Sequence, residues 1–262
     1  MIRKSKCACR RGELTIRGWE YRPAQEKGKF PIAVISHGFM SNHKSVVRYA
    51  EKFAGWGWCA YIYDFCGGCL RGKSDGKTTD MSVLTEMEDL KAVIAYAKSC
   101  SYVDPDQLLL MGCSQGGFVS AMTAAQMPEE VGHLILFYPA LCIPDDARNG
   151  SMMAAKFDPS DIPEVISCGP MKLGRVYPES VLKMDPFEEI RSYPGPTLIV
   201  HGTADAIVNV SYAQRAYEAY TDEKPESHPE KELTLIEGGA HGFSRRHDKI
   251  AIAAVERFLS RI

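Results

Sequence analysis

The chain carries near its middle the stretch Gln107-Leu108-Leu109-Leu110-Met111-Gly112-Cys113-Ser114-Gln115-Gly116. Its first half is an apolar run typical of a buried strand, and a helix-like segment follows the second glycine. Gly-x-Ser-x-Gly between a strand and a helix is typical of a nucleophile elbow, a sharp turn that presents the serine hydroxyl at the carboxyl end of the strand. Glycines suit such a turn because they lack the Cβ atoms that would clash. The pattern makes Ser114 a candidate nucleophile. A catalytic site also requires a base and an acid elsewhere in the chain.

A serine hydroxyl needs a base within hydrogen-bond reach, and that base needs an acid that fixes its tautomer. In the fold that uses this elbow, the acid comes next along the chain and the histidine comes last. Asp205 follows the apolar run 197–202, and His241 follows the strand-like run 232–237. Both residues therefore stand just past the end of a predicted strand, in the required order. We predict that Ser114, His241 and Asp205 are nucleophile, base and acid.

Other histidines and acids lack this placement. His201 lies inside the apolar run before Asp205, which favours a structural role with a hydrogen bond to the Asp205 loop. Asp222 and Glu223 also follow the serine, but the charged, proline-containing stretch 221–226 is typical of a solvated loop. The remaining histidines without a comparable context are His43, His133, His228 and His247.

Attack on a carbonyl creates an oxyanion, which preorganised backbone N–H groups stabilise; the loss of one donor typically costs about 3 kcal/mol. The run 30–36 reads as a buried strand and leads into His37-Gly38-Phe39. In this fold the loop after that strand supplies one donor, and the residue after the nucleophile supplies the other. We therefore predict that the backbone N–H groups of Phe39 and Gln115 form the oxyanion hole. His37 is expected to shape the loop through its imidazole.

Composition favours one enzyme domain spanning residues 1–262. The net charge of −2 does not indicate the basic surface that binds nucleic acid, so no nucleic-acid partner is expected. No apolar stretch approaches the roughly 20 residues that span a bilayer, so no membrane partner is expected. The basic segment 1–11 lacks the apolar run of a signal peptide, and we expect a cytoplasmic protein.

The chain has nine cysteines, an odd number with irregular spacing, which favours reduced thiols over a disulfide framework. Cys66 and Cys69 form a C-x-x-C pair, and Cys7 and Cys9 form a second close pair. A structural zinc site needs four ligands at one point. The first pair is predicted in a loop and the second near the chain end, so we expect neither a metal nor another cofactor.

Strand-like and helix-like runs alternate along the chain, which predicts an α/β fold of parallel β-α-β units. The run 13–21 alternates polar and apolar residues and predicts an antiparallel edge strand. About sixty residues separate the strand-like run 134–138 from the one at 197–202, more than one crossover helix needs. Such an insertion is typical of a lid, which we place at residues 141–185. The predicted helices span 44–55, 82–98, 115–126, 212–220 and 249–261.

These features together resemble the α/β-hydrolases and, within them, the small bacterial cinnamoyl (feruloyl) esterases. The resemblance covers nearly the whole chain. The matching segments are His37-Gly38-Phe39, residues 72–76, Ser114-Gln115-Gly116-Gly117, residues 156–159 with Ile162-Pro163, and the loops around Asp205 and His241.

The resemblance implies a mostly parallel central sheet with helices on both faces, an inserted lid, and a cofactor-free acyl-enzyme mechanism on hydroxycinnamate esters. It also implies that Asp146 and Tyr177 of the lid bind the phenolic end of the acid; a capping role for Asp146 and a packing role for Tyr177 are the alternatives. Met153 stands where a polar lid residue is expected, and residues 66–71 replace a shorter loop.

Other functions remain open: a short-chain carboxylesterase or thioesterase, a serine peptidase, and a non-catalytic ligand-binding homologue. The expected partner is a small-molecule ester, and a homodimer is left open.

Overall fold

The computed structural model describes residues 1–24, 28–222, 228 and 230–261. Most of the predicted solvated loop at 221–226 lies outside these residues, because 223–227 are not among them. Within the described part, no helix is both long enough and apolar enough to cross a membrane.

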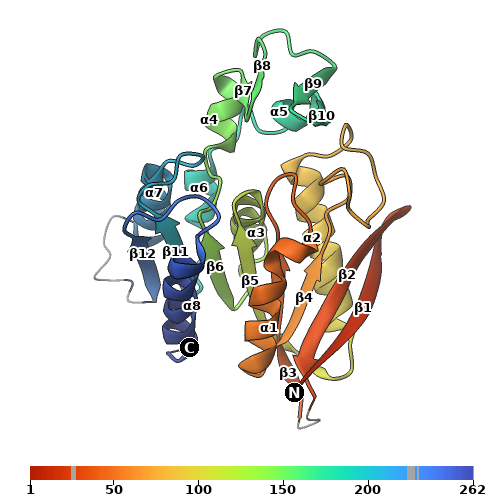
Figure 1. Ribbon diagram of the computed structural model, residues 1–262, viewed down its shortest axis with the longest axis vertical. Helices are drawn as coiled ribbons and strands as arrows, with labels where there is room; N and C mark the ends of the chain where they lie inside the picture. Colours follow the sequence, from red (N-terminus) through yellow and green to blue (C-terminus); the bar gives the residue numbers. More distant parts are fainter. Residues whose placement is uncertain (25–27, 223–227, 229, 262) are drawn as a thin grey trace.

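A central sheet of eight strands organises the described chain (Figure 1). The second strand pairs antiparallel with both the first and the third, and from the third strand to the last all pairs are parallel. The mostly parallel sheet predicted from the alternating pattern is thus confirmed. In spatial order the strands are β1 (Ile2–Arg11), β2 (Leu14–Pro23), β4 (Cys59–Tyr63), β3 (Phe30–Ser36), β5 (Val103–Cys113), β6 (His133–Phe137), β11 (Thr197–Gly202) and β12 (Lys231–Ile236).

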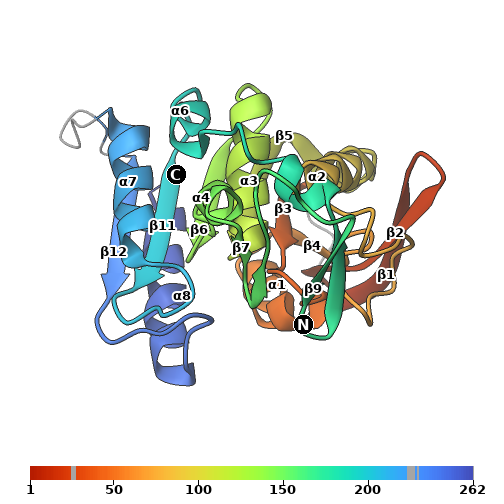
Figure 2. The same ribbon diagram turned by 90° about the horizontal axis from the view of Figure 1, so that it is seen from above.

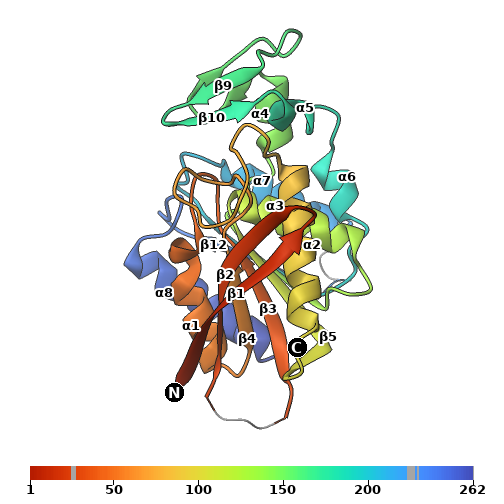
Figure 3. The same ribbon diagram turned by 90° about the vertical axis from the view of Figure 1, so that its right-hand side faces the viewer.

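Helices cover both faces of the sheet (Figure 3). The short 3₁₀ helix η1 (His43–Val46) leads into α1 (Val47–Gly55), which lies with α8 (Arg245–Leu259) on one face, while α2 (Val83–Lys98), α3 (Gln115–Gln126) and α7 (Val210–Thr221) lie on the other. Successive side chains of a strand point to opposite faces. In β5, accordingly, Leu108 and Leu110 join the core under α2 and α3, whereas Leu109 and Met111 join the core under α1 and α8.

The prediction for the N-terminus was wrong. The antiparallel edge strand is β1, and the run predicted as the edge forms β2, one position inside. The first strand escaped notice because its residues are basic, small or sulfur-containing, and it lacks a continuous apolar face. Lysines on an exposed edge discourage pairing with other chains. Arg11, at the end of β1, forms an ion pair of 2.5 Å with the buried carboxylate of Asp89 on α2.

Helix α2 shows how the apolar spacing produces a buried face. Ser82 caps its N-terminus and exchanges hydrogen bonds with Thr85, which satisfies two backbone donors. Of the apolar residues that recur at helical spacing, Leu84 is exposed and the others are buried, namely Met87, Leu90, Val93, Ile94 and Ala97. The same face also buries two acids, Glu86 and Asp89, which the apolar pattern did not indicate.

The predicted insertion lies above the carboxyl ends of the parallel strands (Figures 1 and 2). We call residues 141–185 the cap. Many of its apolar side chains, among them Ile166, Leu173 and Tyr177, are buried and continue the core under α2 and α3. After the cap, α6 (Pro186–Ile190) leads back to β11. The cap elements are α4 (Ile143–Arg148), the hairpin β7 (Ser151–Met152) and β8 (Ala155–Lys156), the hairpin β9 (Val165–Cys168) and β10 (Met171–Gly174), and α5 (Val176–Glu179).

The Gly116→Ala substitution tests how tightly the start of α3 packs against β3. A Cβ at this position would overlap the carbonyl oxygens of His37 and Ser36. Both are backbone atoms that cannot rotate away, so we expect a loss of about 3 kcal/mol in the free energy of unfolding, measured by urea denaturation.

Gly55→Ala at the end of α1 is the matched control, because a Cβ there meets no atom within 4 Å. It should change stability by less than about 1 kcal/mol. Equal effects of the two substitutions would contradict the packing described here.

Candidate active site

The elbow lies between β5 and α3, as its sequence predicts. Ser114 adopts φ 56° and ψ −120°, a left-handed conformation that costs a non-glycine residue strain. The turn can be this tight because the backbones of Gly112 and Gly116 are in direct contact. A Cβ on Gly112 would overlap the carbonyl of Gly116. Strain held by surrounding structure is common at functional sites.

The structure brings the three predicted site residues together. His241 Nε2 lies 3.0 Å from Ser114 Oγ, and His241 Nδ1 lies 2.8 Å from Asp205 Oδ2. A carboxylate only accepts hydrogen bonds, so Nδ1 carries the proton of the neutral ring and Nε2 is left to accept the serine hydroxyl. The ring of Tyr138 lies against the imidazole, with 4.6 Å between the ring centroids.

Four donors surround the Asp205 carboxylate. Its Oδ1 accepts the backbone N–H groups of Ile207 and Val208, both at 2.9 Å. Its Oδ2 lies 3.2 Å from Nε2 of His201 as well as near His241. Burial alone would raise the pKa of Asp205, but hydrogen bonds from the two histidines and the two backbone groups outweigh it and hold the pKa well below its usual range. The acid is therefore ionised at neutral pH.

His201 has the structural role expected for it. The ring is fully buried, and Nε2 also lies 3.0 Å from the carbonyl oxygen of Val208. Since a carbonyl only accepts, Nε2 carries the ring proton and can donate toward both Val208 and Asp205. This residue fastens the acid to its own loop.

The two predicted oxyanion donors border the same pocket. Phe39 and Gln115 both line it beside Ser114. Among the described residues, no hydrogen bond occupies either backbone N–H. His37 shapes the loop as expected, because its Nδ1 lies 2.8 Å from the Gly38 carbonyl and its Nε2 accepts the N–H of Phe65 at 3.3 Å. Burial lowers the pKa of His37, which keeps the ring neutral.

Asp64 supports this loop from behind and was missed by the sequence reasoning. Its carboxylate accepts the N–H and Nδ1 of His43 and the N–H of Lys73, each at 2.7 Å. It thereby fastens the segment after Phe39 to the loop after β4. The available signal was an acid at the end of the apolar run 59–63.

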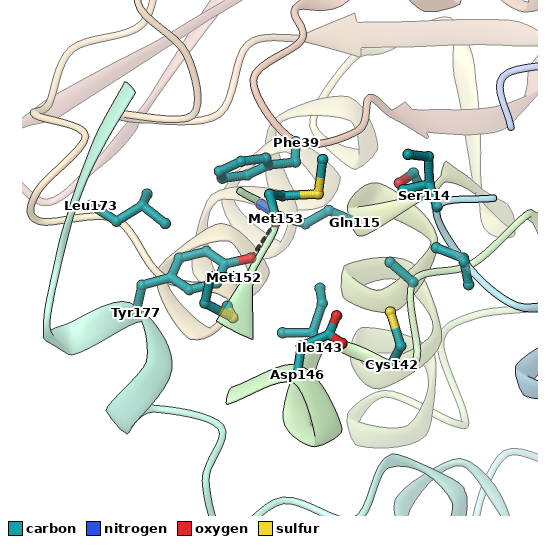
Figure 4. Close-up of a pocket in the computed structure, with 13 residues that line it drawn as sticks. Phe39, Ser114, Gln115, Cys142, Ile143, Asp146, Met152, Met153, Leu173 and Tyr177 are labelled. Carbon is teal, nitrogen blue, oxygen red and sulfur yellow. Dashed lines mark hydrogen bonds between the residues drawn. The ribbon is translucent and has the colours of Figure 1, made fainter. Parts of the chain in front are cut away.

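The pocket runs from Ser114 beneath the cap (Figure 4). Figure 4 places Ser114 at one side and Tyr177 with Leu173 at the other, with Asp146 between them. The cavity measures about 50 Å³, whereas an apolar cavity that holds benzene measures about 150 Å³. An aromatic ring therefore fits only when side chains move. The other lining residues are Phe39, Gln115, Ala140, Cys142, Ile143, Met152, Met153, Ile207 and Val208.

Both predicted cap residues line the pocket. Burial raises the pKa of Asp146, and the Cys142 thiol opposes this shift. The Tyr177 side chain is buried, and its hydroxyl donates to Oε1 of Gln115. Since that proton is engaged, the Tyr177 oxygen can only accept from a ligand. Met153, on the turn between β7 and β8, is half-exposed and has a left-handed φ of 54°.

The cysteines do not form a metal site in the described part of the chain. No cluster of three or more potential ligands occurs there. Burial raises the pKa of the Cys66 thiol to about 12 and that of Cys7 to about 12, which disfavours the thiolate that binds metals. Cys113 is buried behind the elbow and does not line the pocket.

The fold and this constellation define the class: the protein is an α/β-hydrolase. Within that class it belongs to the Hydrolase_4 family, described as serine aminopeptidase, S33, which it matches over residues 30–177. The chain is therefore a hydrolase.

Several solved structures are similar to this chain over nearly its whole length. Est1E from Butyrivibrio proteoclasticus, solved with bound ferulic acid, is 26% identical, with a TM-score of 0.87 over 97% of this chain and 98% of that one. A second structure of Est1E has 24% identity and a TM-score of 0.83, with coverage of 97% and 98%. The esterase PF2001 from Pyrococcus furiosus, at 20% identity and a TM-score of 0.71 with coverage of 99% and 91%, shows the same fold.

Among curated proteins, the quorum-quenching protein AidA from Acinetobacter baumannii (strain MDR-ZJ06) is 32% identical over 107 residues. The match covers 40% of this chain and 34% of that protein, so the chain spans about a third of the length of this relative.

Asp205→Asn tests the charge at the centre of this constellation. The amide has one acceptor end and one donor end, so it cannot accept from the two histidines and from the two backbone N–H groups at once, and we expect a loss of about 2 kcal/mol in the free energy of unfolding at pH 7. Because the folded-state pKa of Asp205 is lowered, its contribution is fully present above the unfolded pKa of about 4 and is lost as the pH falls through the folded pKa. The difference between wild type and variant should therefore shrink below about pH 4.

Denaturant titrations at several pH values measure this difference. Asp106→Asn, on an exposed acid, is the control and should show neither effect. If the difference in the free energy of unfolding between wild type and Asp205→Asn stays constant down to pH 2, Asp205 does not have the lowered pKa assigned to it.

Proposed function

We propose that the protein is a serine carboxylic-ester hydrolase that acts through an acyl-enzyme intermediate. The observation that carries the proposal is the continuous chain of hydrogen bonds from Asp205 through His241 to Ser114. Ser114 borders a pocket together with two backbone N–H groups that make no hydrogen bond to any residue the structure describes. His241 removes the proton of Ser114 as its oxygen attacks the ester carbonyl. The N–H groups of Phe39 and Gln115 hold the oxyanion.

The same groups complete the cycle. The protonated His241 gives its proton to the leaving alcohol, and Asp205 stabilises the imidazolium in the meantime. A water molecule then attacks the acyl-enzyme with His241 as base, and the acid is released. Apart from the ester and water, the cycle uses only residues of this chain.

We assign a hydroxycinnamate, of the feruloyl or caffeoyl type, as the acyl group. The pocket walls are mainly apolar and aromatic, as an aromatic acid requires, and Asp146 and Tyr177 supply the polar contacts. A phenol hydroxyl can donate to the Asp146 carboxylate or the Tyr177 oxygen. Met152 and Met153 narrow the cavity, and their unbranched side chains can change rotamer to admit the ring. The likeness to Est1E, which was solved with bound ferulic acid, supports this substrate class.

A short-chain carboxylesterase or thioesterase is the second candidate, and the small cavity of about 50 Å³ favours it. The family description names a serine aminopeptidase, which keeps amide hydrolysis as a third reaction to test.

Ser114→Ala tests the chemistry. Without the nucleophile, kcat for methyl ferulate should fall by more than about a thousandfold. A thermal melt and circular dichroism check that the variant is folded, and Ser101→Ala, on an exposed serine, is the control. Turnover retained by folded Ser114→Ala protein would falsify the proposed role.

A substrate panel tests the acyl preference. We expect kcat/KM to be at least about tenfold higher for methyl ferulate than for methyl butyrate, with no turnover of a dipeptide amide. Asp146→Ala should remove the advantage of methyl ferulate over methyl cinnamate, which lacks the ring hydroxyl. If the aliphatic ester reacts equally well or better, the hydroxycinnamate assignment fails and the short-chain esterase takes its place.

A further inference from the structure

Three buried polar side chains form a chain that the esterase mechanism does not use. They come from three separate elements: Glu86 from the first turn of α2, Gln115 from the start of α3, and Tyr177 from α5 of the cap. Their exposed fractions are 1%, 2% and 2%. Nε2 of Gln115 donates to Oε2 of Glu86 at 2.7 Å, and the Tyr177 hydroxyl donates to Oε1 of Gln115, the contact dashed in Figure 4.

Both ends of the Gln115 carboxamide are therefore engaged, and the hydrogen-bond directions fix its orientation. The carbonyl accepts from Tyr177, so the amide nitrogen must face Glu86. If Glu86 were apolar, the amide N–H groups would lose their buried acceptor, at a cost of about 1–3 kcal/mol. Glu86 thus holds the carboxamide in the orientation that Tyr177 needs.

The carboxyl of Glu86 accepts the Gln115 hydrogen bond in a buried setting that favours its neutral form. Burial raises its pKa well above the usual range, and the repulsion of Asp89 adds to the effect. Among the described residues no cation pairs with Glu86, whereas Arg11 pairs with Asp89. A glutamine, which is neutral and has a carbonyl oxygen at the same distance from the backbone, can replace such an acceptor.

At its other end the chain contacts both sides of the oxyanion site. Tyr177 bonds to the side chain of Gln115, and its ring packs on Phe39 with 6.0 Å between centroids. These are the two residues whose N–H groups are assigned to the oxyanion. Tyr177 is thus the cap side chain that links the acyl pocket to the elbow and to the loop after β3.

We propose that Glu86 is a positioning residue that acts through the Gln115 side chain to hold Tyr177, and with it α5 of the cap, in place over the acyl pocket. The inference rests on the proposed esterase function, because it assigns the chain a role in acyl binding. Its alternative is that the three groups only stabilise the core, and the two roles predict different kinetics.

The test compares Glu86→Leu, which removes the acceptor, with Glu86→Gln, which keeps it. With methyl ferulate, Glu86→Leu should raise KM about tenfold and leave kcat within about twofold, whereas Glu86→Gln should resemble the wild type. KM for methyl butyrate, which does not reach Tyr177, should change less than about twofold. Glu88→Ala, an exposed acid on the same helix, is the matched control.

A double-mutant cycle with Tyr177→Phe tests the connection directly. Glu86 and Tyr177 are joined through Gln115, so the double variant should be no worse in KM than the worse single variant. Additive effects, or equal losses with both esters, would overturn the proposal in favour of a purely structural role. Should Glu86→Leu fail to fold, Gln115→Leu removes the middle of the same chain and enters the same cycle.

Limited proteolysis gives a readout that does not depend on activity. Trypsin should cut the cap at the exposed Lys156, Lys172 or Arg175 faster in Glu86→Leu than in Glu88→Ala. If the wild type failed to hydrolyse esters, the proposed function would fall, while faster cap cleavage would still support the positioning of the cap by Glu86. Unchanged cleavage together with unchanged KM would reject that role.

Discussion

The site depends on the close contact of backbones at the carboxyl edge of the sheet. Gly116 of the elbow packs against the carbonyls at the end of β3, and Gly202 at the end of β11 packs in the same way against Gly239 after β12. Neither contact leaves room for a Cβ atom. The first brings the Phe39 loop beside Ser114, and the second brings the Asp205 loop beside the His241 loop. These two contacts allow Ser114 and His241, which are 127 positions apart in sequence, to form a hydrogen bond.

The residues of the candidate site were predictable because each is tied to a local pattern. A glycine pair around a serine after an apolar run predicted the start of α3, and the helix expected at 115–126 has the observed bounds. Asp205 and His241 were recognisable because each stands just past the end of a predicted strand. The strand before Asp205, β11, is completely buried and carries a strong apolar signal, whereas β12 before His241 is a part-exposed edge strand that alternates polar and apolar residues.

The parts that were not predicted are polar side chains at buried positions and the edge strand of the sheet, β1. Strand β1 pairs along ten residues but has no continuous apolar face, so its side chains carry little signal. Glu86 and Asp64 are buried acids whose partners come from distant elements: Gln115 is 29 positions away from Glu86, and His43 is 21 positions away from Asp64. Side-chain periodicity within one element cannot reveal such pairs, because the partner determines whether burial is tolerated.

The cap combines two kinds of restraint. Its second half is fastened, since Leu173 and Tyr177 are fully buried and Tyr177 is hydrogen-bonded to the residue after the nucleophile. Its first hairpin is looser, because Met153 is 56% exposed on a two-residue turn and Met152 lines the pocket beside it. Room for a larger acyl group therefore comes at least cost from the methionines, whose flexible side chains can move without breaking a buried hydrogen bond. The chain from Glu86 to Tyr177 keeps the opposite wall in place while they move.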